Sequence, residues 1–375
     1  MARFLIIASL ASSLRNFRGS LIRDIRSRGH EVHAAAPGLE ADAATRSWLD
    51  AQGVICHEVP ISRTGLDPRA DLRALIALWR LMRRLRPDIC LGYTIKPVIW
   101  GGLAAWLARV PRRVALITGL GYAFTGAAGG KRALVRWIVM RLYGASLRRA
   151  TLVFFQNPDD RDDFRRWQLL PATVSAEVVN GSGVDTSAFE PAPFPDGPMR
   201  FLLIARLLGD KGVREYARAA ADLRARWPEV EFHLVGPLDP NPTGITEAQV
   251  RGWHQAGTLV WHGAVDDVRP FIAGVHVYVL PSYYREGTPR TVLEAMSMGR
   301  PIITTDAPGC RETVQDGVNG SLVPVRDAGA LLGAMEKFLS DPSLVPSMGA
   351  RSRRIAEEKY DVHKVNAAMI AAMNL

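Results

Sequence analysis

Residues 275–305 read VHVYVLPSYYREGTPRTVLEAMSMGRPIITT, and this stretch decides the fold class. Val275–Leu280 is apolar and β-rich, which predicts a buried strand, and Pro301–Thr305 predicts the next strand. Between them, Thr288 is a typical N-cap followed by proline, and Gly299 is a typical helix end. A strand, a helix and a strand in this order predict a parallel βαβ unit.

The same alternation of short apolar runs and helical segments continues along the chain. Further strands are predicted at Arg3–Ala8, Glu31–Ala36, Val54–Val59, Asp88–Gly92, Arg113–Thr118, Thr151–Gln156, Val174–Val179, Arg200–Ala205, Val230–Val235, Thr258–His262 and Ser321–Val323. This order predicts an α/β protein with two doubly wound, Rossmann-like domains. Parallel sheets bind ligands at the carboxyl ends of their strands, so two such domains facing a central cleft would share one site.

The length of 375 residues also favours two domains over one. Four prolines between Pro191 and Pro198 predict an extended linker. We therefore expect an N-terminal domain at residues 1–190, a C-terminal domain at residues 191–360, and a helix at residues 361–375 that returns to the first domain.

The basic charge of the chain belongs to its first half. Residues 1–180 contain 27 Lys and Arg against 14 Asp and Glu, whereas residues 181–375 contain 20 against 23. Such an asymmetry predicts an anionic partner: a membrane surface, a nucleic acid or a phosphorylated substrate. Residues 131–149, KRALVRWIVMRLYGASLRR, mix arginines with Trp, Leu and Ile as in a helix lying on an anionic membrane, and Asp71–Arg86 would widen that surface. The alternative is a helix packed on the sheet with solvated arginines.

Several function classes are disfavoured. The three cysteines are far apart, which argues against disulfides and fits a reducing cytosol. The apolar start reads as a first buried strand, not as a secretory signal, and no segment is long and apolar enough to span a bilayer. The first loop lacks G-x-G-x-x-G, so an NAD enzyme is not expected. The acidic run Asp159–Asp163 reads as a helix start, and the eight histidines have no ligand spacing, so we expect no metal and no cofactor.

Two stretches of the second half predict an anion site. The loop Pro281–Gly287 leads into the helix over Thr291–Gly299, and a helix start offers backbone N–H groups to an anion such as phosphate. Glu286 precedes this helix and Glu294 lies on it; the alternative is that the first only caps the helix and the second is a solvated surface residue.

After the strand Arg200–Ala205, the sequence RLLGDKG places two cations on one loop. Arg206 and Lys211 can converge on one anion, or belong to a solvated turn with Asp210 as a cap.

These motifs together resemble a known family. Arg-x4-Lys after a strand, then EGTPRTVLEAMSMGRPIITTDAPGCRE from Glu286 and GVNGSLVP from Gly317, is similar to the donor half of the retaining family 4 glycosyltransferases of GT-B fold. The first half, through YTIKPVIWG at residues 93–101 and TGLGY at residues 118–122, resembles bacterial enzymes that extend sugars linked to undecaprenyl diphosphate, such as the N-acetylgalactosaminyltransferase of bacterial N-glycosylation.

The resemblance implies roles for individual residues. Arg206 and Lys211 would bind the donor diphosphate and, with Glu286, would be the catalytic residues. Glu286 would face the donor sugar, and Glu294 would hold the ribose hydroxyls of the nucleotide. The loop around the sugar and phosphate would be formed by Gly287, Thr288 and Pro289. Retention of the anomeric configuration is likewise implied by the resemblance.

The first domain departs from the family pattern, because its first loop lacks the glycine pair and TGLGY has no histidine. Candidate residues for the acceptor or the first-domain loops are Asn16, Arg18, Gly19, Lys96, Thr118, Gly119 and Gly121. The glycines also fit plain strand-to-helix turns. Lys96 would meet the acceptor diphosphate, although a lone lysine is more often a surface residue.

We therefore expect a retaining glycosyltransferase that moves a hexose or N-acetylhexosamine from a nucleotide sugar, favouring UDP, to a lipid-linked saccharide at the cytoplasmic face of the membrane. The alternatives are a transferase with a soluble acceptor, a nucleotide-sugar 2-epimerase of the same architecture, and a basic nucleic-acid-binding protein. The last predicts strongly salt-dependent binding, and the sequence has no nucleic-acid recognition motif.

Overall fold

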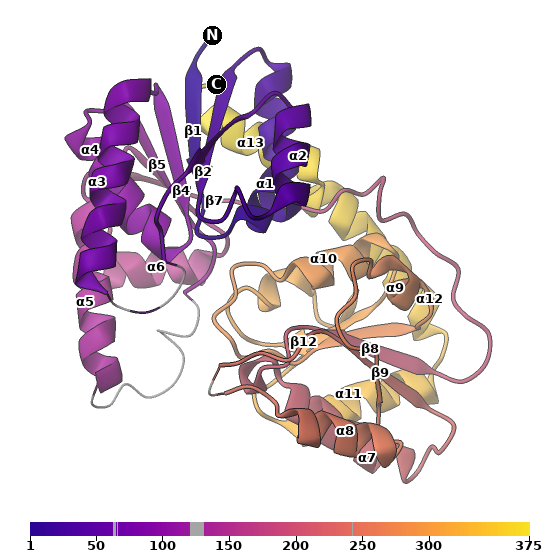
Figure 1. Ribbon diagram of the computed structural model, residues 1–375. Coiled ribbons are helices and arrows are strands. Elements are labelled where there is room, and N and C mark those ends of the chain that lie inside the picture. The colour runs from indigo at the N-terminus through magenta and orange to yellow at the C-terminus, as the bar shows by residue number, and fades with distance from the viewer. Residues whose placement is uncertain (63–64, 66, 121–130, 242) are drawn as a thin grey trace. The chain divides into compact units, whose positions relative to one another are not determined.

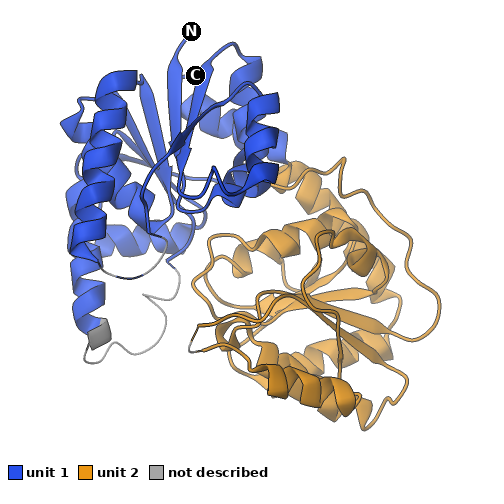
Figure 2. Ribbon diagram, in the orientation of Figure 1, with its two compact units in different colours: residues 1–182, 362–375 blue, residues 183–361 orange. Residues whose placement is uncertain are grey.

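The computed structural model describes residues 1–62, 65, 67–120, 131–241 and 243–375. The chain forms two compact units (Figure 2). Unit 1 contains Met1–Ser182 together with Val362–Leu375, and unit 2 contains Gly183–Asp361. The chain therefore passes from unit 1 to unit 2 eight residues before the position expected from the prolines, and its last segment belongs to unit 1.

Among the described residues of unit 1, seven parallel strands form one sheet in the order β3-β2-β1-β4-β5-β6-β7 (Figure 1). The strands are β1 (Arg3–Ile7), β2 (Glu31–Ala36), β3 (Ile55–Glu58), β4 (Ile89–Tyr93), β5 (Arg112–Ile117), β6 (Leu152–Phe155) and β7 (Ser175–Val178). One face is covered by α1 (Ala11–Ser27), α2 (Ala43–Ala51) and α13 (Val362–Ala372). The other is covered by α3 (Pro68–Leu85), α4 (Gly102–Leu107), α5 (Lys131–Leu147) and α6 (Pro158–Arg166).

Unit 2, as far as its residues are described, repeats this architecture with six parallel strands in the order β10-β9-β8-β11-β12-β13. The strands are β8 (Arg200–Ile204), β9 (Glu231–Val235), β10 (Val260–Trp261), β11 (Val277–Leu280), β12 (Ile302–Thr305) and β13 (Gly320–Val323). Helices α7 (Val213–Arg224), α8 (Glu247–Gln255) and α11 (Ala328–Ser340) pack on one face, and α9 (Arg269–Ala273) and α10 (Arg290–Ser297) on the other. Helix α12 (Leu344–Ile355) contributes to both cores.

The predicted fold class is confirmed, because both units are doubly wound parallel sheets and every predicted strand overlaps an observed one. The predicted start of α10 is wrong by one residue. Thr288 is not the N-cap; Pro289 is, with an extended backbone (ψ 113°) and no side-chain cap, so the helix begins at Arg290. Gly299 follows the helix with a φ of +76°, as expected for a glycine that ends a helix.

Both units carry the same side-chain arrangement on their first three strands. An arginine on the first strand pairs with a glutamate on the second, which contacts a histidine two residues on, and that histidine stacks on another histidine in or after the third strand. In unit 1 these residues are Arg3, Glu31, His33 and His57. In unit 2 they are Arg200, Glu231, His233 and His262. The two sheets therefore place equivalent residues at equivalent positions.

The proline-rich segment, which lies inside unit 2 and not between the units, is held by the fully buried Arg300. The Arg300 guanidinium donates to the carbonyl oxygens of Ala192 (2.8 Å) and Pro193 (3.0 Å), and it stacks over the Phe194 ring at 4.6 Å. It also donates to three carbonyls near α9 and α10. Burial lowers the pKa of Arg300 to about 10. The extended, proline-rich segment thus has a fixed place on the surface of unit 2.

Candidate functional site

The strand order of unit 2 reverses between β8 and β11, and the loops that leave these two strands carry the predicted donor-site residues. Ligands of doubly wound sheets bind at such a reversal, outside the carboxyl ends of the strands. After β8, Gly209–Lys211 form one turn of 3-10 helix that ends at Gly212 with a φ of +74°. A side chain at Gly212 would overlap the Pro281 carbonyl oxygen, since its Cβ would lie 2.1 Å away. The glycine thus lets the first loop approach the second.

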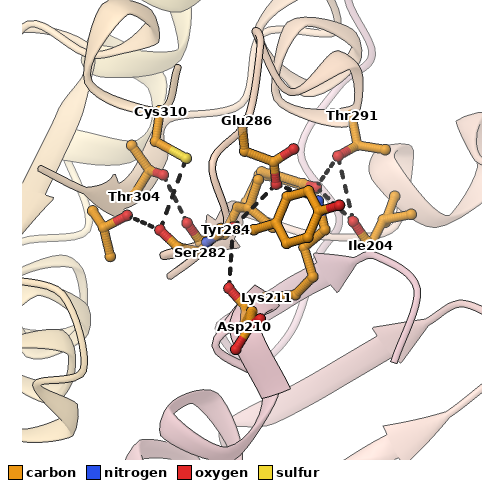
Figure 3. A network of polar contacts seen from close by, with 12 residues as sticks. Ile204, Asp210, Lys211, Ser282, Tyr284, Glu286, Thr291, Thr304 and Cys310 are labelled. Carbon is orange, nitrogen blue, oxygen red and sulfur yellow. Dashed lines mark hydrogen bonds and ion pairs between the residues drawn. The ribbon is translucent and has the colours of Figure 1, made fainter. Parts of the chain in front are cut away.

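The Lys211 ammonium forms an ion pair with the Glu286 carboxylate (Figure 3). These residues are 75 positions apart in the sequence, and both side chains are mostly buried, with exposed fractions of 13% and 12%. Ser282 donates a hydrogen bond from its hydroxyl to Glu286 at 3.0 Å. The Lys211 ammonium also lies over the ring of Tyr284, 4.9 Å from its centre. A cation and a carboxylate are therefore held together at the carboxyl ends of β8 and β11.

The two loops are joined by their backbones as well. The carbonyl oxygen of Asp210 accepts hydrogen bonds from the N–H groups of Tyr283 and Tyr284, both at 2.9 Å. The backbone of Asp210 therefore links the two loops, and the residue also belongs to the 3-10 turn. These bonds fix the position of Lys211 relative to the Glu286 loop.

Arg206, the second predicted cation, is more exposed than Lys211. Its guanidinium pairs with Asp239 at 2.7 Å, and 44% of its side chain is accessible. It also interacts with the Tyr284 hydroxyl, so Tyr284 contacts both cations. Burial raises the pKa of Tyr284, and the charge of Lys211 works against that rise. The structure thus brings Arg206, Lys211 and Glu286 around one tyrosine that sequence reasoning did not single out.

Glu294 is buried, with an exposed fraction of 6%, so the alternative of a solvated surface residue is wrong. Its carboxylate accepts a hydrogen bond from Arg290 Nε at 2.8 Å, one turn earlier on α10. Burial raises the pKa of Glu294, and the Arg290 charge opposes that rise. A buried carboxylate with one cationic partner keeps further lone pairs for hydroxyl donors.

The loop that carries Glu286 is supported by β12 and the segment after it, which sequence reasoning missed. Thr304 donates to the Leu280 carbonyl at 2.7 Å, and Thr305 donates to the Ser282 carbonyl. Gly309 has a φ of +83°, and a Cβ there would lie 2.3 Å from the carbonyl oxygen of Gly287 and 2.7 Å from that of Glu286. The signal present in the sequence was the Pro-Gly pair at residues 308–309, which is typical of a tight turn.

In unit 1, the predicted first-domain residues lie at separate places: inside α1, after β5 and, for Lys96, directly before the π-helical turn Pro97–Gly101. Asn16, Arg18 and Gly19 lie inside α1 and not in a loop before it, because the helix already begins at Ala11. Arg18 is buried, with its guanidinium 5.3 Å from the centre of the Tyr93 ring. Gly19 allows Trp48 of α2 to approach, since a Cβ would lie 3.1 Å from its ring. Thr118 and Gly119 follow β5, and Gly119 has a φ of +99°. Gly121 lies outside the described residues.

Lys96 is buried, with an exposed fraction of 9%, so the alternative of a surface lysine is wrong. Its ammonium contacts the Asp71 carboxylate at 2.7 Å and the Ser62 hydroxyl at 2.6 Å. Asp71 lies in the first turn of α3, 25 residues earlier in the sequence. The charge of Lys96 is therefore balanced within unit 1.

The helices with the basic residues expose apolar side chains. On α3, Leu72, Ile76 and Trp79 follow one face and are 55%, 38% and 38% exposed. On α5, Leu134 and Trp137 are 60% and 55% exposed. Neither helix can cross a membrane, and the same holds for all helices in the described ranges.

The acidic run in unit 1 forms the start of α6, as predicted. Asn157 is the N-cap and accepts a hydrogen bond from the Asp160 N–H at 2.7 Å. Asp159 and Asp160 lie in the first turn, where carboxylates complement the helix dipole. Within the described parts of the chain, no group of three or more His, Cys, Asp or Glu side chains is arranged to hold a metal ion.

Comparison with known families assigns each half of the chain. Residues 15–181 match the family described as glycosyl transferase 4-like domain, and residues 198–341 match glycosyl transferases group 1. Together these matches cover most of both units.

Two relatives align with this chain over most of their lengths. One is the N,N'-diacetylbacillosaminyl-diphospho-undecaprenol alpha-1,3-N-acetylgalactosaminyltransferase of Campylobacter jejuni, 28% identical over 90% of this chain and 89% of that protein. The other is the UDP-Gal:alpha-D-GlcNAc-diphosphoundecaprenol alpha-1,3-galactosyltransferase of Escherichia coli, 25% identical over 73% of this chain and 72% of that protein.

Two solved structures share the fold over the whole chain. Sucrose-phosphate synthase from Thermosynechococcus elongatus has a TM-score of 0.82 at 18% identity, covering 100% of this chain and 98% of that one. Anabaena HepE in complex with UDP and glucose has a TM-score of 0.79 at 16% identity, covering 100% of both chains. At this identity the likeness concerns the fold alone.

Proposed function

Because this chain belongs to the glycosyltransferases of GT-B fold, with a glycosyl transferase 4-like domain followed by a group 1 domain, we propose that it transfers a hexose or N-acetylhexosamine from a UDP-sugar to a saccharide linked to undecaprenyl diphosphate, with retention of the anomeric configuration. The observation that carries the proposal is the meeting of Lys211 and Glu286 at the reversal of the unit 2 sheet, directly before α10. Lys211 supplies a positive charge, and Glu286 supplies a carboxylate that can accept hydrogen bonds from hydroxyls. Both lie at the place where such sheets bind nucleotides.

The cations stabilise the leaving group. Cleavage of the bond between the anomeric carbon and the diphosphate oxygen leaves negative charge on the diphosphate. Lys211 and Arg206, together with the N-terminus of α10, offset this charge electrostatically. The acceptor hydroxyl oxygen forms the new bond to the anomeric carbon, its proton passes to the departing phosphate oxygen, and nucleoside diphosphate leaves.

The carboxylates orient the donor. Glu286 accepts hydrogen bonds from hydroxyls of the donor sugar, in a loop that includes Gly287, Thr288 and Pro289. Glu294 accepts from the ribose hydroxyls, for which burial and the Arg290 contact fix its position. Each carboxylate therefore acts as a positioned acceptor of hydrogen bonds and not as a hydrolytic acid or base.

The acceptor class is supported by the two relatives named above, whose names both describe sugars on undecaprenyl diphosphate. A UDP carrier is supported by the name of the Escherichia coli relative. The exposed apolar stripe Leu72, Ile76 and Trp79 on α3, next to exposed Arg73 and Arg80, fits peripheral binding to an anionic membrane, where such an acceptor resides.

The test is transfer by purified protein with a panel of UDP- and GDP-sugars, with and without membrane extract that contains undecaprenyl-diphosphate sugars. We expect nucleoside diphosphate release and radiolabel in the lipid phase with one donor. Lys211→Ala and Glu286→Ala should each lower kcat by about 100-fold or more, since each removes a positioned charge at the reacting centre.

Exposed residues of the same types, in Lys337→Ala and Glu358→Gln, serve as charge controls and should retain activity. Turnover of the donor without any acceptor would indicate the epimerase alternative, and transfer only to soluble sugars would contradict the lipid-linked acceptor. Equal activity in the Lys211 and Lys337 variants would contradict the proposed site.

A further inference from the structure

The strand order of unit 1 also reverses, between β1 and β4. The side chains at this reversal differ from those at the reversal in unit 2. The residues that follow these strands are Ser9 and Thr94. Their hydroxyl oxygens are 2.8 Å apart, and both side chains are half-buried. Since ligands of doubly wound sheets bind at such reversals, this hydroxyl pair stands where unit 2 places its loops with Lys211 and Glu286.

Thr94 adopts a conformation that β-branched residues rarely adopt. Its φ is +67°, in the left-handed region. The segment that follows it is a π-helical turn at Pro97–Gly101, and a Cβ at Gly92 would lie 2.6 Å from the Pro97 carbonyl oxygen. Close packing of this turn against β4 therefore imposes the conformation of Thr94. Backbone strain of this kind is concentrated at binding and catalytic sites.

A second contact between two hydroxyls joins the same two segments and is more buried. The Tyr93 hydroxyl and the Ser13 hydroxyl are 2.7 Å apart, and Ser13 also donates to the Leu10 carbonyl at 2.6 Å. Burial raises the pKa of Tyr93 to about 12, so its hydroxyl stays protonated at neutral pH. These contacts anchor the start of α1 to the end of β4 and so fix Ser9 and Thr94 relative to each other.

The positive charge of Lys96, the lysine nearest to Thr94 in the sequence, is neutralised inside unit 1. Lys96, two residues after Thr94, is paired with Asp71 and Ser62. The bond between Ser9 and Thr94 uses one of their two hydroxyl hydrogens, which leaves a donor and several lone pairs for a ligand. Neutral groups that both donate and accept match the hydroxyls of a sugar ring, whereas a diphosphate requires cations.

We infer that Ser9 and Thr94 form a subsite for a neutral sugar ring, which on the proposed function is the sugar of the lipid-linked acceptor. Ser9 and Thr94 recognise ring hydroxyls and do not themselves bind the acceptor diphosphate. Both residues act as binding residues, and the strained turn at Thr94 aims its hydroxyl at the ligand.

The experiment measures binding and does not depend on turnover. Methyl glycosides of glucose, galactose, N-acetylglucosamine and N-acetylgalactosamine are titrated by ligand-observed NMR against the wild-type protein, Ser9→Ala, Thr94→Ala and Thr94→Ser. One glycoside or more should bind the wild type, and the two alanine variants should weaken it by about tenfold or more, the effect of a lost hydrogen bond. Thr94→Ser keeps the hydroxyl at the same backbone position and should retain binding.

UDP binding, measured by calorimetry on the same samples, should stay within twofold of wild type in all variants. The inference is overturned if no methyl glycoside binds the wild type, if binding survives in Ser9→Ala and Thr94→Ala, or if those variants weaken UDP instead. The inference is also overturned if these variants weaken the binding of inorganic pyrophosphate, because the subsite would then be an anion-binding site. The proposed function fails by a different result, namely that no donor labels lipid in the wild-type protein.

Discussion

Replacing Gly309 by alanine should displace the loop that carries Glu286. The new Cβ would lie 2.3 Å from the Gly287 carbonyl oxygen and 2.7 Å from that of Glu286, whereas ordinary contact begins at 3.4 Å. The loop must therefore shift by about 1 Å, and a misplacement of that size can cost on the order of 100-fold in rate. We expect a fall of about 100-fold in kcat/KM for sugar transfer.

A second effect of Gly309→Ala is independent of the overlap and needs its own control. An alanine at a φ of +83° costs about 1 kcal/mol of folding stability. Gly317 has a similar φ of +73°, and nothing lies within 4 Å of the position that a Cβ would take there. Gly317→Ala should therefore lose about the stability that the positive φ alone costs, and it should keep full activity.

The assay combines initial rates of nucleoside diphosphate release, calorimetric UDP binding and urea unfolding for the two alanine variants and the wild type. The reasoning predicts that both variants lose stability, Gly309→Ala more because of the overlap, and that only Gly309→Ala loses kcat/KM. If both variants lose activity to the same extent, the loss reflects backbone strain in general. If Gly309→Ala stays within twofold of Gly317→Ala, the loop is not held in place by the contact at Gly309, and the positioning argument is refuted.

Three further predictions follow from other contacts. Glu286→Gln should tighten UDP binding about threefold to tenfold while lowering transfer, because the carboxylate competes with the diphosphate for Lys211; weaker UDP binding in calorimetry would contradict this. Arg300→Met should lower the free energy of unfolding by about 3 kcal/mol, since it removes the donor of five carbonyls, in two buried and three partly buried hydrogen bonds; an unchanged urea midpoint would count against it. Burial, and to a lesser extent the charge of His33, lowers the pKa of His57 from 6.5 to about 4. Between pH 6.5 and about pH 4 the unfolded chain therefore binds more protons than the folded chain. The free energy of unfolding should fall as the pH drops through this window. Because the side chain is half-exposed, the expected loss is about 1 kcal/mol, and a urea series from about pH 7 to 4 should show a smaller slope for His57→Gln.

The architecture was predictable because short apolar runs of parallel strands are distinctive and alternate with helices. The meeting of Lys211 with the Glu286 loop was predictable in outline, since both follow strands of one sheet. Their direct ion pair was not, because spacing along the sequence does not determine which partner a side chain chooses across a loop.

Other features have no local sequence signal at all. The partner of Lys96 is Asp71 on a separate helix, so a reading of the residues around Lys96 cannot find it. Thr94 has a positive φ although threonine predicts extended backbone, and only the packing of the following turn explains that conformation. The one-residue error at Thr288 arises because Pro289 fits both an N-cap and a first helical residue by its φ of −69°.

The return of the chain to unit 1 has a consequence for biosynthesis. Helix α13 supplies Val365, Met369 and Ile370 to the core shared with α1 and the sheet, and Asn366 donates to the Asp24 carboxylate at 2.7 Å. A ribosome releases these residues only after all of unit 2 has been made. The half that is synthesised first is thus completed last, so a nascent chain halted after Ser182 would leave an apolar face of unit 1 open to chaperones and proteases.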